Sequence, residues 1–228
     1  MSDHKTLVVV SGGLSEESTT HRLADGLTKA VVTRADQAGL TTDVVRIDVR
    51  DLSQEIASAS LTGFATARLD EAYEALGRAD AVIAVTPTYK ASYTGLFKGF
   101  WDVTPDGVMA GVPVVVAATG GTARHSLVTD FALRPLFSYM KSLVMPTAVY
   151  AAPEDWAGSG LASRQDEAAA ELVGQLTAGS VTASDADPQE GEGDDSSRTS
   201  SRTLRGTRER ARDPFVSVPT MEQMLGGR

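Results

Sequence analysis

The first stretch that could do chemistry places hydroxyl side chains around a double glycine. The apolar run Leu7–Val10 predicts a buried strand, and Gly12 and Gly13 after it would let the chain turn sharply and let a ligand approach the backbone. The hydroxyl residues around this turn are Ser11, Ser15, Ser18, Thr19 and Thr20. Because a helix N-terminus presents free N–H groups and a partial positive charge, the pattern predicts a phosphate cradle of hydroxyls and backbone amides without lysine.

A simpler interpretation of the same stretch is a helix cap, since a Ser or Thr before a helix usually has that role. Glu16 and Glu17 would repel a phosphate, so a cradle requires both to face solvent. The dinucleotide fingerprint lacks its third glycine until Gly26, and no Gly-Lys-Ser/Thr follows the first strand. Asp48, at the end of the second expected strand, could act as the ribose-binding acid of that fingerprint, but one acid without the glycines carries little weight.

Two further segments with suitable chemistry follow later apolar runs. In the first, which contains Pro87, Thr88, Tyr89 and Lys90, the rings of Tyr89 and Tyr93 could pack on a planar ligand, although ordinary packing explains them equally well. The second is Thr119-Gly120-Gly121-Thr122, where the glycines allow backbone to approach a flat ligand or simply form a tight turn. If the three strands are parallel, all three loops meet at one edge of the sheet.

Apolar periodicity supplies the elements that would position these loops. Strands are predicted at 7–10, 42–49, 81–85, 112–118 and 143–151, and helices at 23–38, 64–77, 94–103, 125–142 and 162–176, with 50–62 as a loop. Strands that alternate with helices in this way predict an α/β fold with a doubly wound parallel sheet. Five strands fit the flavodoxin-like order 2-1-3-4-5, in which a ligand lies beyond the carboxyl ends of the strands.

Composition excludes several classes of protein. Of the 228 residues, 42% are hydrophobic, which is ordinary for a globular protein. The net charge of −9 argues against nucleic-acid binding, and the lack of cysteine excludes disulfides and zinc–thiolate sites. Three scattered histidines (His4, His21 and His125) suggest no metal site. We expect a cytoplasmic protein, because no apolar run could span a membrane and the N-terminus has no signal-peptide pattern.

The composition changes after Gly179. Residues 185–195 hold six acids, and residues 198–212 hold six arginines and one acid. We therefore expect a folded domain at 1–179, a charged disordered linker at 180–213 and a C-terminal segment at 214–228. The apolar residues of that segment could dock on a neighbouring subunit or a partner, although an undocked tail is nearly as plausible.

Two of these segments carry a family resemblance. The runs Thr86–Lys98 and Ala118–Pro135 resemble the hallmark segments of NAD(P)H-dependent FMN reductases, and the likeness spans about residues 6 to 178. The chain looks most similar to flavin reductases of two-component systems that partner a luciferase-like monooxygenase. The resemblance implies FMN, a donor that is NADPH or NADH, and a homodimer or homotetramer. The net charge and the lack of a long apolar run argue against a nucleic-acid or membrane partner.

The resemblance also implies a site. The flavin phosphate would lie on Ser11, Ser18, Thr19 and Thr20 beside Gly13, and the ring edge against Pro87, Thr88, Tyr89, Lys90, Thr119, Gly120, Gly121 and Thr122. Related reductases begin the phosphate loop with Gly-Ser-Pro, whereas this chain has Ser11-Gly12-Gly13. They often carry a tyrosine, in a helix tied to tetramer packing, where this chain has Phe131.

The expected chemistry is direct hydride transfer from nicotinamide to flavin, which needs stacking and orientation rather than an acid–base pair. No catalytic side chain is therefore expected. Lys90 and Arg124 could contact cofactor phosphates or stabilise reduced flavin, or could be plain surface charges. The alternatives are a quinone or small-acceptor reductase on the same fold, and a flavodoxin-like electron carrier; the lysines and missing acids of 86–98 disfavour the carrier. The choices of NADPH or NADH, of FMN or FAD, and of flavin as substrate or tight cofactor stay open.

Overall fold

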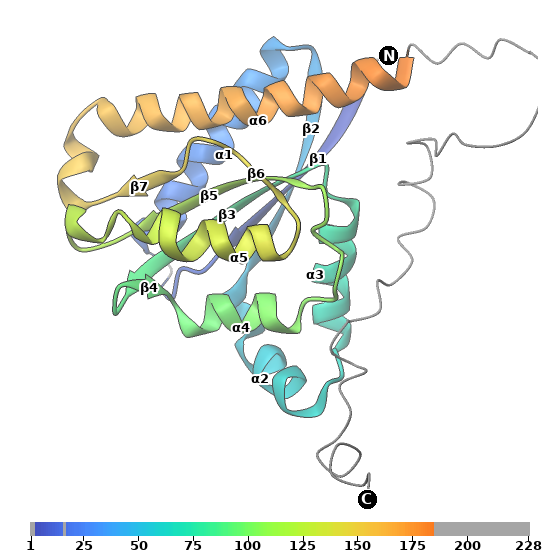
Figure 1. Cartoon of the computed structure of the whole chain (residues 1–228), viewed down its shortest axis with the longest axis vertical. Coiled ribbons are helices and arrows are strands. Elements are labelled where there is room, and N and C mark those ends of the chain that lie inside the picture. The colour runs from blue at the N-terminus through green and yellow to red at the C-terminus, as the bar shows by residue number, and fades with distance from the viewer. Residues whose placement is uncertain (1–2, 16, 185–228) are drawn as a thin grey trace, which may run out of the picture. The chain divides into compact units, whose positions relative to one another are not determined.

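The computed structural model describes residues 3–15 and 17–184, all of which belong to the unit Met1–Glu192 (Figure 1). The expected segment 214–228 and nearly all of the expected linker lie outside the described residues. The last helix, α6 (Gly160–Ser184), runs past the expected domain boundary at Gly179. None of the helices in the described part of the chain is long and apolar enough to cross a membrane.

The core of the fold is a parallel sheet. Its strands are β1 (Asp3–Ser11), β2 (Leu40–Asp48), β3 (Ala81–Tyr89), β5 (Pro113–Thr119), β6 (Leu143–Val144) and β7 (Val149–Ala151). The order is β2-β1-β3-β5-β6, with β7 also paired to β5, so the flavodoxin-like order is confirmed. The expected fifth strand is two short pieces, because the intervening residues include Pro146, which cannot donate a ladder hydrogen bond.

Helices cover both faces of this sheet (Figure 1). On one face α1 (Thr19–Gln37) and α6 pack against buried side chains such as Leu7 and Ile83. The helices of the other face are α2 (Ser53–Thr62), α3 (Ala67–Arg78), α4 (Gly95–Val103) and α5 (Arg134–Tyr139). The strands are therefore buried on both sides, as their continuous apolar runs predict.

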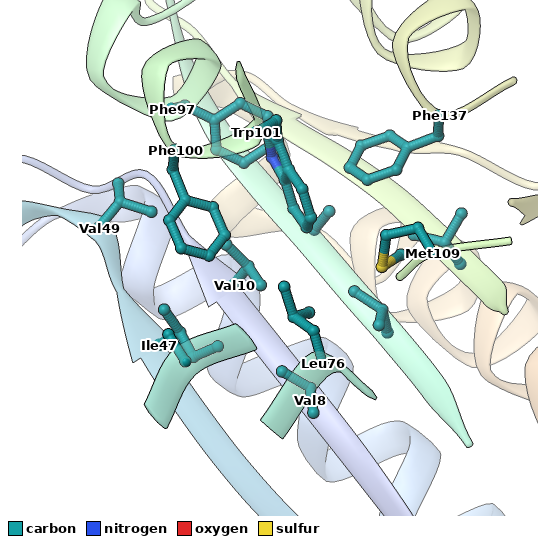
Figure 2. Close-up of a cluster of buried hydrophobic side chains, with 14 of the residues drawn as sticks. Val8, Val10, Ile47, Val49, Leu76, Phe97, Phe100, Trp101, Met109 and Phe137 are labelled. Carbon is teal, nitrogen blue, oxygen red and sulfur yellow. The ribbon is translucent and has the colours of Figure 1, made fainter. Parts of the chain in front are cut away.

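An aromatic cluster fixes α4 under the carboxyl edge of the sheet (Figure 2). The Trp101 ring meets those of Phe97, Phe100 and Phe137 edge-on, with centroids 5.9, 5.1 and 4.9 Å away. Each such pair adds about 0.5–1.5 kcal/mol beyond the area it buries. Thr94 caps α4 by accepting a hydrogen bond from the Phe97 N–H, which fixes the start of the helix as well.

Two expected elements were wrong. Residues 50–62 are not a loop: a 3₁₀ turn (Val49–Leu52) leads into α2, which ends at Gly63 with a φ of +74°. The helix is short, and only its buried Ile56 and Ala59 mark its apolar face, which explains why periodicity missed it.

The second correction concerns residues 125–142, which are not one helix. They comprise the end of a 3₁₀ turn (Ala123–His125), a π-helical turn (Thr129–Leu133) and α5. Pro135, near the start of α5, cannot donate the helical hydrogen bond to the residue four places earlier. A wider turn before the proline accommodates this loss.

Candidate functional site

The three expected loops lie together at the carboxyl edge of the sheet. Strand register places Ser11 opposite Val85, and Pro87 opposite Thr119. The Gly12 N–H donates to the Val85 carbonyl at 2.7 Å, and a Cβ on Gly12 would contact the side chains of Phe97 and Pro87. The β1–α1 loop (residues 12–18) is thus seated against β3 and α4.

Ser18 in this loop is the N-cap of α1. Its hydroxyl oxygen accepts hydrogen bonds from the backbone N–H groups of Thr20 and His21, at 3.0 and 3.4 Å. The capping interpretation therefore holds for Ser18, but a hydroxyl that accepts these bonds keeps its own O–H to donate. Thr19, the first residue of α1, is exposed. Ser18 and Thr19 can therefore both reach a ligand at the helix N-terminus.

Thr20 has a different environment from Thr19. Its side chain is buried, and its Oγ1 lies 2.8 Å from Oγ1 of Thr119. Thr20 therefore links the β1–α1 loop to β5 rather than facing solvent. Glu17 is exposed, as a phosphate cradle requires, and Glu16 lies outside the described residues.

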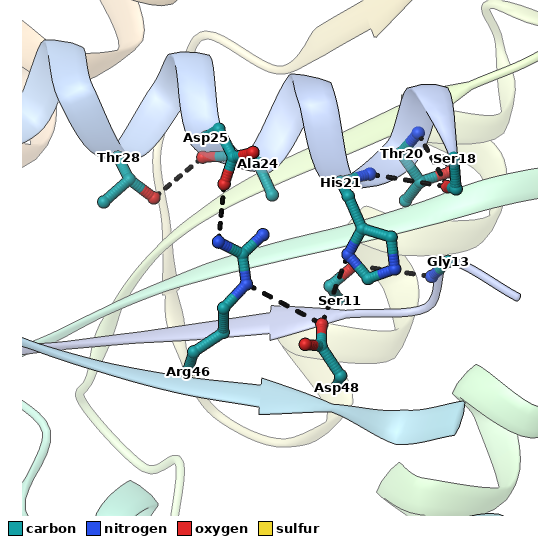
Figure 3. A network of polar contacts seen from close by, with 10 residues as sticks. All are labelled: Ser11, Gly13, Ser18, Thr20, His21, Ala24, Asp25, Thr28, Arg46 and Asp48. Carbon is teal, nitrogen blue, oxygen red and sulfur yellow. Dashed lines mark hydrogen bonds and ion pairs between the residues drawn. The ribbon is translucent and has the colours of Figure 1, made fainter. Parts of the chain in front are cut away.

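A polar network lies on the β2 side of the loop (Figure 3). The Nδ1 atom of His21 is 3.1 Å from the Ser11 hydroxyl and 3.3 Å from Oδ1 of Asp48. Ser11 has no exposed surface and also accepts from the Gly13 N–H at 3.4 Å. Its expected contact with phosphate would therefore require this network to open. Sequence reasoning did not place His21 in the site. The signal that could have found it is its position in the first turn of the helix, three residues after Ser18.

The loop after β3 is a strained hairpin. Tyr89, at the end of β3, pairs with Ser92 of the short antiparallel strand β4 (Ser92–Tyr93). The two turn residues between them, Lys90 and Ala91, have φ values of 51° and 65°. Positive φ at both central positions is typical of a type I′ turn, which favours glycine and asparagine. A residue other than glycine is strained at positive φ, and backbone strain of this kind is often found at functional sites. Tyr89 and Lys90 are exposed, Thr88 is half-buried and Pro87 is buried.

The loop after β5 contains two glycines with different surroundings. A Cβ on Gly120 would collide with the Tyr150 hydroxyl, whereas a Cβ on Gly121 would meet nothing within 4 Å. The Tyr150 hydroxyl donates to the Thr122 carbonyl at 2.8 Å. Gly120 is therefore required by packing, while Gly121 leaves space for a flat group.

Tyr150 is a second residue that sequence reasoning missed, since it lies in β7 and reaches the site only through the pairing of β7 with β5. Burial raises the pKa of the Tyr150 phenol; the Thr88 hydroxyl opposes this rise, and the carboxylates of Glu154 and Asp155 add to it. The phenol therefore stays protonated at neutral pH and remains a donor to the loop carbonyl.

The residues present fit a flavin mononucleotide. Hydroxyls at the N-terminus of α1 suit its phosphate, and the open side of Gly121 beside the β3 hairpin suits a planar ring. Arg124 is exposed nearby in the sequence, and the Thr122 hydroxyl accepts from its backbone N–H at 3.4 Å. This arrangement can bind and orient a ligand without a proton-transferring side chain.

Comparison with known proteins identifies the family. The sequence model of the family described as NADPH-dependent FMN reductase matches residues 5–157. The chain is 38% identical over 148 residues to the NADH-dependent FMN reductase SfnF of Pseudomonas putida, an alignment that covers 65% of this chain and 77% of that protein. It is 33% identical over 172 residues to the FMN reductase (NADPH) of Pseudomonas aeruginosa, covering 75% of this chain and 90% of that one.

A solved structure agrees with these relatives. An oxidoreductase from Corynebacterium diphtheriae superposes with a TM-score of 0.75 at 41% identity, over 78% of this chain and 99% of that one. The parallel sheet, its order and the match over residues 5–157 all agree with one assignment. The chain therefore belongs to the NADPH-dependent FMN reductase family, and it is an NAD(P)H:flavin oxidoreductase that uses FMN.

Proposed function

We propose that this reductase supplies reduced flavin to a partner monooxygenase of the luciferase-like type. The observation that carries the proposal is the composition of the phosphate cradle: residues 11–20 include hydroxyls and glycines but no Lys or Arg. Hydroxyls and amides can donate to the phosphate but bring no opposite charge and no bidentate arginine contact, so we expect this cradle to hold the flavin weakly. A weakly held flavin can leave once it is reduced.

Two arginines close to the cradle, Arg22 and Arg46, do not fill this gap. Arg22 stacks over the Trp156 ring, 4.4 Å from its centroid. Arg46 lies 2.5 Å from Asp25 and 3.8 Å from Asp48. Both cations are thus engaged away from the cradle, which supports an exchangeable flavin.

The roles of individual residues follow from their positions. When bound, FMN supplies the ring that accepts hydride directly from the nicotinamide. Ser18 and Thr19 would hold the phosphate at the N-terminus of α1. The ring would lie between the β3 hairpin, at Pro87, Thr88, Tyr89 and Lys90, and the β5 loop, at Thr119, Gly120, Gly121 and Thr122. This positioning is the contribution of the protein to the reaction.

Flavin exchange can be tested directly. The full-length chain should reduce FMN with NADPH, NADH or both, and it should be colourless after dialysis. Under anaerobic gel filtration of the reduced mixture, the flavin should elute with the small molecules. A yellow protein whose FMN survives dialysis and elutes with the chain would contradict the exchange on which the partner depends. A quinone in place of FMN tests the alternative acceptor.

We also propose that the chain forms a homodimer or homotetramer. Four exposed apolar side chains fall within residues 127–143: Leu127, Phe131, Tyr139 and Leu143, which are 60%, 78%, 77% and 46% exposed. A second copy that covers them would remove this surface from water. Phe131→Asp should shift the mass measured by light scattering toward the monomer, while Leu61→Asp, at an equally exposed site on α2, should not. An unchanged mass for Phe131→Asp would reject this surface.

A further inference from the structure

A cavity of about 370 Å³ lies beside the β1–α1 loop, on its β2 side. Its lining residues come from α1, from the end of β2 and from the turn that follows: His21, Asp25, Arg46, Asp48, Arg50 and Asp51. His21 belongs to both regions, because its ring also contacts Ser11 below the loop (Figure 3). The cavity therefore adjoins the expected position of the flavin phosphate.

We propose that this cavity binds the adenylate half of a dinucleotide, which could come from FAD or from NAD(P)H. The inference rests on the proposed place of the flavin phosphate at the N-terminus of α1. The rest of FAD, continuing from that phosphate, would enter the cavity next to His21. The adenylate of NAD(P)H would reach the same cavity by passing over the bound flavin phosphate. The volume lies within the usual range of small-molecule sites.

Asp48 provides the acceptor for the ribose. It ends β2 directly opposite Ser11, the last residue of β1. In dinucleotide-binding folds an acid at the end of the second strand accepts hydrogen bonds from a ribose, beside a phosphate loop after the first strand. The buried Oδ1 of Asp48 lies 3.3 Å from His21 and 3.8 Å from Arg46 but accepts no hydrogen bond within the described residues. The hydrogen-bonding capacity of this carboxylate is therefore not exhausted.

Arg50 provides a cation for the phosphate. It is exposed in the 3₁₀ turn after β2, and no ion pair is found for it among residues 3–15 and 17–184. The other arginine of the lining, Arg46, is paired with Asp25. Arg50 is thus the lining cation that can turn to a ligand without breaking a bond.

The three carboxylates of the lining restrict the ligand. Asp25, Asp48 and Asp51 would repel any phosphate, so inorganic phosphate, which brings no hydrogen-bond donors to offset this repulsion, should not bind. They suit a ligand in which one phosphate is joined to a ribose and a base with hydrogen-bond donors. An adenylate has this combination.

Calorimetric titration of the full-length chain tests the proposal. In the first arm the affinity for FMN is compared with that for FAD. In the second arm, with FMN saturating, the affinities for NAD⁺ and NADP⁺ are compared with that for nicotinamide mononucleotide. The oxidised forms are used so that no turnover occurs. The wild-type chain should bind at least one dinucleotide about tenfold more tightly than its mononucleotide, as one charge-assisted hydrogen bond supplies. Arg50→Ala should abolish that preference. Arg78→Ala, at an exposed site paired with Glu74 on α3, is the matched control and should keep it.

The two arms identify the source of the adenylate. Loss of the preference for FAD assigns the cavity to flavin, and loss of the preference for NAD⁺ or NADP⁺ assigns it to the donor. The proposal is overturned if the wild-type chain prefers no dinucleotide, or if Arg50→Ala and the more conservative Arg50→Gln both leave the preference intact. A yellow protein whose FMN survives dialysis would instead contradict the function proposed above, whatever the effect of Arg50→Ala.

Discussion

The side-chain oxygens of Thr20 and Thr119 lie 2.8 Å apart, in a hydrogen bond that joins the first turn of α1 to the last residue of β5. Both side chains are buried. Replacing either by valine leaves the other hydroxyl buried without this partner, which should lower the free energy of unfolding by about 1–3 kcal/mol. The double variant should lose much less than the sum of the two. Urea unfolding of all four proteins measures the coupling, and additive losses would show that the bond contributes nothing.

Thr19 and Ser18 should differ in what they stabilise. Thr19→Val should weaken FMN binding by about 1.5–3 kcal/mol, the value of a hydrogen bond to a charged group, without changing the unfolding midpoint. Ser18→Ala should weaken FMN and also cost about 1 kcal/mol of stability, because the cap of α1 is lost. Riboflavin, which lacks the phosphate, should bind both variants and the wild type alike. Thr33→Val, at an exposed site later in α1, is the control. Equal loss for both flavins would assign Ser18 to capping alone.

The adjacent glycines of the β5 loop should give opposite results. Gly121→Val should abolish FMN binding while the thermal midpoint stays within error, because the added side chain enters open space. Gly120→Ala should lower the midpoint, because its Cβ displaces the Tyr150 hydroxyl from the Thr122 carbonyl. Calorimetry and thermal unfolding of both variants separate the two effects. If Gly121→Val unfolds the chain, that glycine serves the turn rather than the ligand.

The β3 hairpin should be stabilised by removing one side chain. Ala91 has a φ of 65°, which costs a non-glycine residue about 1–2 kcal/mol. Ala91→Gly should recover a net of about 0.5–1 kcal/mol, after the greater entropy of glycine in the unfolded chain is subtracted. Ala170→Gly, in the exposed face of α6, should instead destabilise the protein by about 1 kcal/mol. Equal destabilisation by both substitutions would contradict the strain assigned to Ala91.

The C-terminal region should serve assembly or coupling rather than catalysis. A chain that ends at Ser184, the last residue of α6, should fold and reduce FMN at close to the full rate. It should lose oligomer mass or lose coupling to a monooxygenase, measured as reduced flavin consumed by oxygen. Replacing Phe215, Met221 and Leu225 by serine in the full chain should reproduce the loss if segment 214–228 docks. Unchanged assembly and coupling in both the shortened chain and the triple-serine variant would end the docking hypothesis.

Much of the architecture could be read from the sequence, because the signals that define it are local. Apolar runs such as Leu7–Val10 are typical of a strand covered on both faces, and they alternate with helical patterns. The signal for the end of α1 was also local, because Gly39, with a φ of 77°, follows the C-cap of the helix directly. Where the signal was weak, as in α2, or where Pro135 altered the hydrogen-bonding pattern, the same reasoning failed.

The details of the site depended on contacts between distant parts of the chain. Sequence placed the hydroxyls and glycines near a common edge, but it could not tell that Thr20 faces Thr119 while Thr19 faces solvent. It could not separate Gly120 from Gly121, since the difference lies in the hydroxyl of Tyr150. Composition and periodicity by themselves determined the parallel sheet and the chemistry of its loops. The tertiary structure alone decided which of those groups are engaged in packing or internal hydrogen bonds and which remain free for a ligand. The reason is that strand register brings together side chains that are far apart in the sequence.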